Sequence, residues 1–317
     1  MKRPKTLMDW VDEYVTRRQD LGFRLETERG ELVRFARYVT ASGNHEPLTQ
    51  ELILAWLRSS PHASRTYQAR RLATLRSFAK YLAIYEPRTE IPPARIFGRT
   101  SSRPEPHIYS DQELHQLFRY CEQLKPVGGL RPRTYRLLFG LLAVTGLRVS
   151  EALKLNNSDV DLANGVLHIR DTKFRKSRLV PLHRSTIEAL RQYVRVRDQH
   201  HPAPPSEAFL LSEQGRRLPY PTVRGFFREL RGQFGWDRAV GHQRRPRIQD
   251  LRHSFACRRI LSWYQEGAAV DLLIPSLSTY LGHAKVSDTY WYLTGIPELF
   301  SITAQKFEQF AAKGRRP

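Results

Sequence analysis

The chain has 317 residues and carries 52 lysines and arginines against 31 aspartates and glutamates, which gives a formal net charge of +21. This length predicts about two domains, and this charge is typical of a protein with a polyanionic partner, most often nucleic acid. No apolar run approaches the roughly 20 residues of a membrane-spanning helix and no signal peptide is evident, so we expect a cytoplasmic, nucleoid-associated protein. The two cysteines, Cys121 and Cys257, form no CxxC pair, which argues against a structural zinc site.

The first 85 residues show the apolar spacing of four helices. They are expected after Thr6, around residues 32–39, over 48–57 and over 64–85. The apolar positions of the fourth helix lie on one face, and its other face is predicted to carry Arg65, Arg70, Arg71, Arg76 and Lys80. Such a face is most often simply solvated, but the net charge of the chain makes a phosphate-contacting face an equal alternative.

Residues 86–107 change character, being rich in proline and without a helical period. This composition predicts an extended linker between two domains. The second domain is expected to begin at Tyr109, where Ser110 followed by Glu113 fits a capping box.

The second domain is predicted to be mainly helical, with one change of period. Between Gly165 and His183, apolar and polar residues alternate, which predicts a hairpin or small sheet with Lys173 near its turn. Helices are expected over 133–143, 150–155, 185–198, 220–234, 250–265, 274–281 and 286–293. The fold class is therefore mainly α with a small β-sheet, in two domains.

Three segments carry side chains suited to phosphate chemistry. They are TGLRVSEAL with Arg148, IQDLRHSFA with Arg252, and LGHAKVSDTYWY with His283 and Tyr292. Two guanidinium groups match the non-bridging oxygens of one phosphate, and a tyrosine beside them can attack that phosphate and become covalently attached. Taken singly, each residue has an ordinary structural interpretation as a solvated arginine, a capping histidine or a core tyrosine; their order and joint presence favour the functional one.

In order and spacing, these segments resemble the motifs of tyrosine recombinases, the phage integrase family. The resemblance covers about residues 109–292, and the tail after Tyr292 is similar to that of transposon-encoded members. It implies a helical core-binding domain over 1–85, a linker over 86–107 and a catalytic domain over 108–317 whose tail docks into a neighbouring subunit. It also implies double-stranded DNA as substrate, self-association in a dimeric or tetrameric synapse, other recombinases or accessory proteins as further partners, and no metal or other cofactor.

The resemblance assigns catalytic roles residue by residue. The two family arginines fall on Arg148 and Arg252, and the sheet lysine falls on Lys173 in DTKFRKSRLVPL. The His/Trp position falls on His283, and the nucleophile falls on Tyr292, which follows nine residues later. Glu151 matches the acidic position that braces the first arginine, and Tyr290 is the nearest competitor of the nucleophile.

The sequence departs from the family pattern at Gln249, where a histidine usually precedes the second arginine by three residues. Glutamine can hydrogen-bond a phosphate but cannot accept a proton near neutrality. The adjacent His253 is expected to point about 100° away from Arg252 around its helix. The proton of the nucleophile must then leave by another route, or catalysis is slower.

The implied activity is cutting and rejoining of DNA through a 3′-phosphotyrosine, in integration, excision or transposition. Two alternatives stay open at this point. One is a DNA-binding accessory or architectural protein with the same fold and weak catalysis, which Gln249 favours. The other is a relaxing topoisomerase that uses the same chemistry.

Overall fold

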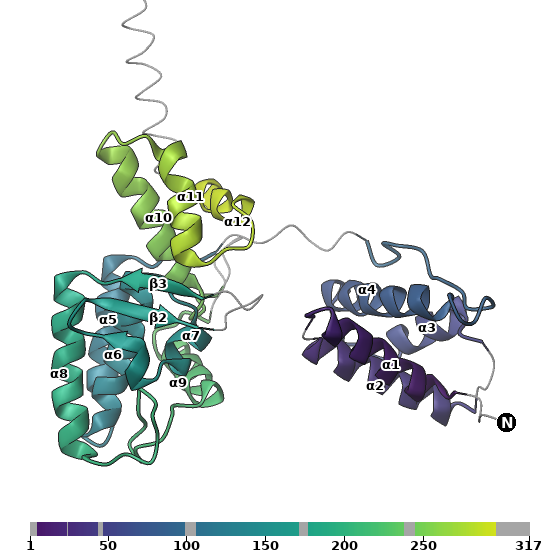
Figure 1. Cartoon of the computed structure of the whole chain (residues 1–317), viewed down its shortest axis with the longest axis horizontal. Coiled ribbons are helices and arrows are strands. Elements are labelled where there is room, and N and C mark those ends of the chain that lie inside the picture. The colour runs from purple at the N-terminus through teal and green to yellow at the C-terminus, as the bar shows by residue number, and fades with distance from the viewer. Residues whose placement is uncertain are drawn as a thin grey trace, which may run out of the picture. The chain divides into compact units, whose positions relative to one another are not determined.

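The computed structural model describes residues 5–23, 25–43, 47–98, 106–170, 177–237 and 245–295. The chain divides into two compact units, residues 1–103 and 104–317 (Figure 1). Each unit has its own hydrophobic core.

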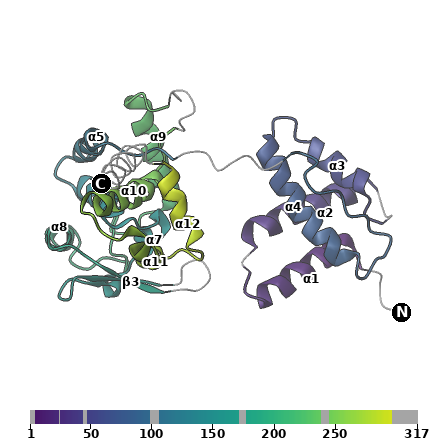
Figure 2. The ribbon, with the colours of Figure 1, turned by 90° about the horizontal axis from the view of Figure 1, so that it is seen from above.

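The N-terminal unit contains the four predicted helices. Thr6 starts the first helix with a capping box to Asp9, and α4 packs against the other three helices and lies across them in Figure 2. The prediction was wrong for Arg71, which is buried rather than part of a solvated face, because it pairs with Glu31 and lies over the ring of Trp56. The helices are α1 (Leu7–Asp20), α2 (Glu26–Ala41), α3 (Gln50–Arg58) and α4 (Arg65–Leu82).

Residues 86–98 of the predicted linker pack on the N-terminal unit. The backbone N–H of Glu90 donates to the carbonyl of Leu48 at 2.8 Å, and its side chain accepts from the N–H of Gln50 at 2.8 Å. Thr89 is buried, and Phe97 packs against the core of this unit. These residues therefore extend the first unit beyond residue 85.

The C-terminal unit holds a three-stranded antiparallel sheet among helices, with strand order β1-β2-β3. The predicted alternation is confirmed in β2, where Leu167 and Ile169 are buried and their neighbours are half-buried. The strands are β1 (Val160–Asp161), which the sequence had not predicted, β2 (Val166–Ile169) and β3 (Arg178–Pro181).

The helices of this unit form two cores that meet near the end of α6. One core surrounds α6, which packs against α5, α8 and α10, and the other lies between α10, α11 and the segment that carries Tyr292. The last predicted helix is instead a short α-helix followed by a 3-10 turn. The helices are α5 (Asp111–Glu122), α6 (Leu130–Thr145), α7 (Val149–Lys154), α8 (Arg184–His200), α9 (Tyr220–Gln233), α10 (Asp250–Gln265), α11 (Val270–Leu281) and α12 (Ser287–Tyr290), with 3-10 turns η1 (Asn157–Asp159) and η2 (Trp291–Gly295).

Among the described residues, no helix combines the length and the apolar character needed to cross a membrane.

Candidate active site

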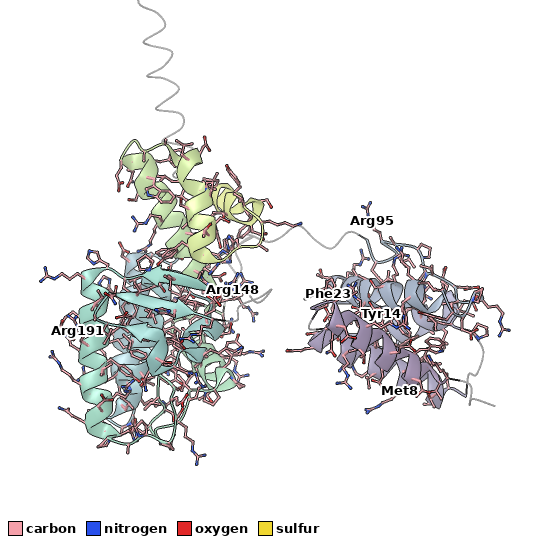
Figure 3. All side chains as sticks on the ribbon, viewed as in Figure 1. Met8, Tyr14, Phe23, Arg95, Arg148 and Arg191 are labelled. Carbon is pink, nitrogen blue, oxygen red and sulfur yellow. The ribbon has the colours of Figure 1, made fainter. Side chains whose placement is uncertain are left out.

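The turn between α6 and α7 positions Arg148. Gly146 ends α6 in the left-handed conformation, and a Cβ there would lie 2.5 Å from the ring of Phe255, so the turn needs glycine. Arg148 then starts α7, and both its backbone N–H and its Nη1 donate to Glu151, at 3.0 and 2.6 Å. The side chain of Arg148 remains 27% exposed, so its guanidinium can reach a ligand (Figure 3).

Arg252 is held in the middle of the unit by α10. It is 2% exposed, and it donates from Nη1 to the carbonyl of Gly146 at 2.8 Å and from Nη2 to the carbonyl of Leu281 at 2.6 Å. Burial, helped by the charge of Arg148, lowers the pKa of Arg252 to about 10, although Tyr292 and Glu151 oppose the shift. The guanidinium therefore stays charged near neutrality.

Tyr292 is buried on η2, whereas Tyr290 is 42% exposed. The hydroxyl of Tyr292 lies 3.4 Å from Nε2 of His283, and it is close enough to Arg252 to affect the pKa of that guanidinium. On the other side of the imidazole, Nδ1 of His283 lies 2.7 Å from Oγ1 of the fully buried Thr289. The structure thus brings Arg148, Arg252, His283 and Tyr292 into one cluster.

Glu151 lies beside this cluster and pairs with Arg178, an arginine that the sequence had not singled out. Arg178, on β3, donates from Nη1 to Oε1 of Glu151 at 3.1 Å and from Nη2 to Oε2 at 2.8 Å. Burial raises the pKa of the Glu151 carboxyl, but the hydrogen bonds and charges of Arg178 and Arg148 outweigh it and lower the pKa to about 2. The only signal of Arg178 in the sequence was its place one residue before the apolar end of the predicted hairpin.

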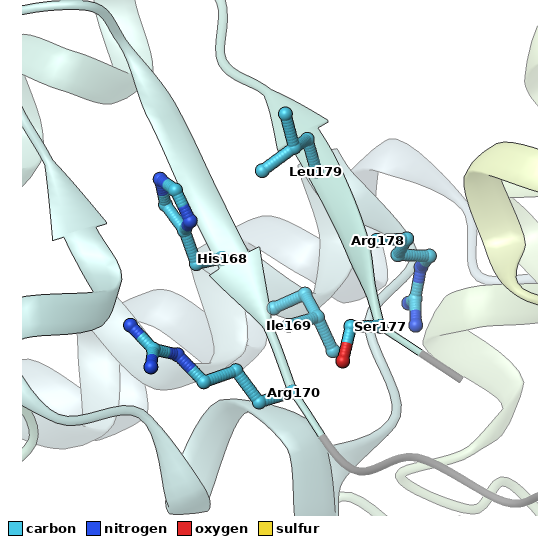
Figure 4. A pocket seen from close by; sticks show the side chains of 6 residues that line it. All are labelled: His168, Ile169, Arg170, Ser177, Arg178 and Leu179. Atoms are coloured by element: carbon cyan, nitrogen blue, oxygen red, sulfur yellow. The ribbon is translucent and has the colours of Figure 1, made fainter. Parts of the chain in front are cut away.

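Three further residues from the sequence analysis are Gln249, His253 and Lys173. Gln249 is half-buried immediately before α10. Because η2 runs beside α10, the His253 ring packs 5.3 Å from the ring of Tyr292, a contact that the sequence did not predict. Lys173 lies outside the described residues. Where β2 ends and β3 begins, on either side of the 171–176 stretch, the structure has an open depression lined by His168, Ile169, Arg170, Ser177, Arg178 and Leu179 (Figure 4).

A small sheet among helices, with a tyrosine hydroxyl against an arginine and a histidine and a second arginine beside them, defines the class of tyrosine recombinases, which are DNA strand transferases. Comparison with known proteins gives the family. The model of the phage integrase family matches residues 108–295, and the chain belongs to this family.

Relatives of known sequence match over most of the chain. It is 41% identical to y4rB of Sinorhizobium fredii, named as an integrase/recombinase, over 96% of this chain and 98% of the relative. It is 29% identical to the tyrosine recombinase XerC of Chlorobaculum parvum, over 71% of this chain and 67% of the relative.

Solved structures share the fold. The XerH recombinase bound to palindromic difH superimposes with a TM-score of 0.65 at 19% identity, over 90% of this chain and 80% of that one. The Tn1549 transposon integrase in complex with transposon right end DNA gives 0.68 at 16% identity, over 97% and 100%.

Proposed function

We propose that this protein is a site-specific DNA recombinase that cuts and rejoins DNA through a 3′-phosphotyrosine on Tyr292. The observation that carries the proposal is the Tyr292 hydroxyl, which lies 3.4 Å from Nε2 of His283 and near the guanidinium of Arg252. A nucleophile in contact with a proton acceptor and a cation is the arrangement that covalent catalysis requires.

The arginines supply positive charge where the reaction develops negative charge. When the tyrosine oxygen attacks, the phosphorane gains negative charge, which Arg148 and Arg252 neutralise as hydrogen-bond donors. The leaving 5′ oxygen needs a proton, and Lys173 is the group that we assign to supply it. The phosphotyrosine keeps the energy of the phosphodiester bond, so the 5′ hydroxyl of a second DNA strand can reverse the step without ATP.

The proton of Tyr292 passes to His283 in this mechanism, since Gln249 cannot take it up. Arg252 has only donors, so it cannot take up the hydroxyl hydrogen, which is left to another acceptor. Nε2 of His283 is within reach, and a proton on Nδ1 would be shared with Thr289. Once protonated, His283 becomes a third donor for the phosphate.

The substrate is double-stranded DNA, on which we infer that the protein self-associates in the cytoplasm at the nucleoid. Solved relatives are bound to DNA, among them a lambda integrase dimer on a core site, over 91% of this chain at 19% identity with a TM-score of 0.57. In this chain, Arg65, Arg70, Arg76 and Lys80 lie exposed or half-exposed along α4. We assign DNA contacts to this helix in the core-binding domain and catalysis to residues 108–317. Such binding should weaken steeply with salt.

The test is covalent capture on a suicide DNA substrate, in which the released end of the cut strand is lost. The wild type should accumulate a denaturant-resistant adduct, and Tyr292→Phe should bind DNA equally but form none. Tyr290→Phe is the matched control and should retain the adduct. An adduct with Tyr292→Phe would refute the assignment, and no adduct with the wild type would favour the accessory-protein alternative.

A further inference from the structure

The C-terminal end of α11 is held by three arginines from three other segments. Arg178 Nε donates to the carbonyl of Tyr280 at 2.7 Å, Arg252 Nη2 to that of Leu281 at 2.6 Å, and Arg148 Nη2 to that of Gly282 at 3.1 Å. The last carbonyls of a helix lack intrahelical partners and carry its negative dipole end, so cations are stabilised there. His283 follows this end directly.

Arg178 differs from the partly exposed Arg148 in what remains for a ligand. All three of its guanidinium nitrogens donate within the protein, two of them to Glu151, and its side chain is only 10% exposed. It also packs on Gly282, where an added Cβ would lie 2.9 Å from Nη1 of Arg178. It is therefore placed to hold other groups and not to hold the phosphate.

Arg148, Arg178 and Glu151 form a cluster whose charges do not cancel. Glu151 carries one negative charge, and its two oxygens accept four hydrogen bonds, two from Arg148 and two from Arg178. With both arginines the cluster has a net charge of +1; without Arg178 it would be neutral. The partly exposed Arg148 is where the excess charge meets a ligand.

We propose that Arg178 is a positioning residue of the recombination reaction, which neutralises Glu151 so that the carboxylate can orient Arg148 without cancelling its charge. This inference rests on the proposed function. An arginine is suited because its planar fork pairs with both carboxylate oxygens at once. The alternative is that Arg178 and Glu151 form a buried ion pair that only stabilises the fold.

A second substitution separates the two interpretations. If Arg178 protects the charge of Arg148, then removing the carboxylate should help a protein that lacks Arg178. If Arg178 is only structural, Glu151→Gln should cost activity in both backgrounds, since it removes a further buried contact. Opposite signs of one substitution in two backgrounds are a direct measure of coupling.

The experiment measures single-turnover cleavage of the suicide substrate at saturating DNA, with the dissociation constant of the DNA complex measured in parallel. Arg178→Met should slow cleavage by about 10- to 100-fold and change DNA affinity by about twofold at most. Arg178→Met with Glu151→Gln should cleave at least about fivefold faster than Arg178→Met alone.

Arg197 provides the matched control. It is also a buried arginine, 8% exposed in its side chain. It lies on α8 and donates to Asn157 and to the carbonyl of Phe209. Arg197→Met should lower the melting temperature without slowing cleavage by the folded fraction. Should Arg178→Met not fold, Arg178→Lys keeps the charge without the fork and should fall between the wild type and the double variant.

The proposal is overturned if the wild type cleaves and Arg178→Met cleaves at the same rate. It is also overturned if the double variant is slower than both single variants. Absence of cleavage by the wild type would instead refute the proposed function.

Discussion

Each unit of this protein buries one glutamate beneath arginines, and the two clusters end differently. In the N-terminal unit, Glu31 accepts from Arg34 at 2.7 Å, from the hydroxyl of Tyr67 at 2.7 Å and from Nε of Arg71 at 3.2 Å. In the C-terminal unit, Glu151 accepts from Arg148 and Arg178. Both carboxylates are 7% exposed in their side chains.

The difference lies in what the far ends of the arginines contact. The guanidinium of Arg71 lies 3.6 Å from the ring of Trp56 and donates to Ser60, so its contacts are to side chains that tie α2, α3 and α4 together. Arg148 and Arg178 donate to backbone carbonyls at the end of α11. The same residue types therefore hold helices together in one unit and fix the geometry of the candidate active site in the other.

The comparison predicts that Arg148 matters for catalysis far more than for the fold. Arg148→Ala should slow single-turnover cleavage by about 10²- to 10³-fold, because the phosphorane loses one donor. DNA affinity should change little, since many other cations contact the phosphates. Equal cleavage by the variant and the wild type at saturating DNA would contradict this.

Arg71→Ala should show the opposite pattern. It leaves the buried Glu31 without one of its partners and removes the stacking on Trp56, so the free energy of unfolding of the N-terminal unit should fall by about 3 kcal/mol. Urea denaturation checks this. Cleavage by the folded fraction should be unchanged, and a large catalytic loss would mean that Arg71 also acts in the site.

The depressed pKa of Glu151 predicts a loss of stability in acid. Its pKa falls from an ordinary value of 4.5 to about 2 in the folded protein, so its contribution is complete above pH 4.5 and is lost as pH falls from 4.5 toward 2. The contribution is on the order of 3 kcal/mol. In Glu151→Gln, the unfolding free energy of the C-terminal unit should depend less on pH in this window, as measured by urea denaturation between pH 3 and 6; an unchanged dependence would refute the ion pairing.

The smallest effect is expected at Gln249, which has no counterpart in the N-terminal unit. If proton removal from Tyr292 limits the rate, Gln249→His should speed cleavage by up to about tenfold, or leave it unchanged if another step limits. A rise of the cleavage rate with pH around 6.5 that Gln249→His shows and the wild type does not would identify the new imidazole. A large loss of cleavage would show that a glutamine hydrogen bond is needed at this position.

The sequence alone predicted most of the helices, two of the three strands and the family. Helix and strand patterns are local, and the capping boxes at Thr6 and Ser110 mark helix starts within four residues. The family motifs are likewise short, so Arg148, Arg252, His283 and Tyr292 could be singled out without knowing their contacts.

Only the tertiary structure decided what these residues touch. Arg178 and Glu151 are 27 positions apart, and Arg178 and Tyr280 are 102 apart, so no local pattern marks their contact. The contact of His253 with Tyr292 was not predicted for the same reason: the angle of His253 on α10 follows from helix geometry, but the position of η2 beside it depends on how α11 and α12 fold back. The local backbone of α11 predicts that its last carbonyls lack partners within the helix. Which side chains donate to them, here three arginines, depends on the packing of the whole unit.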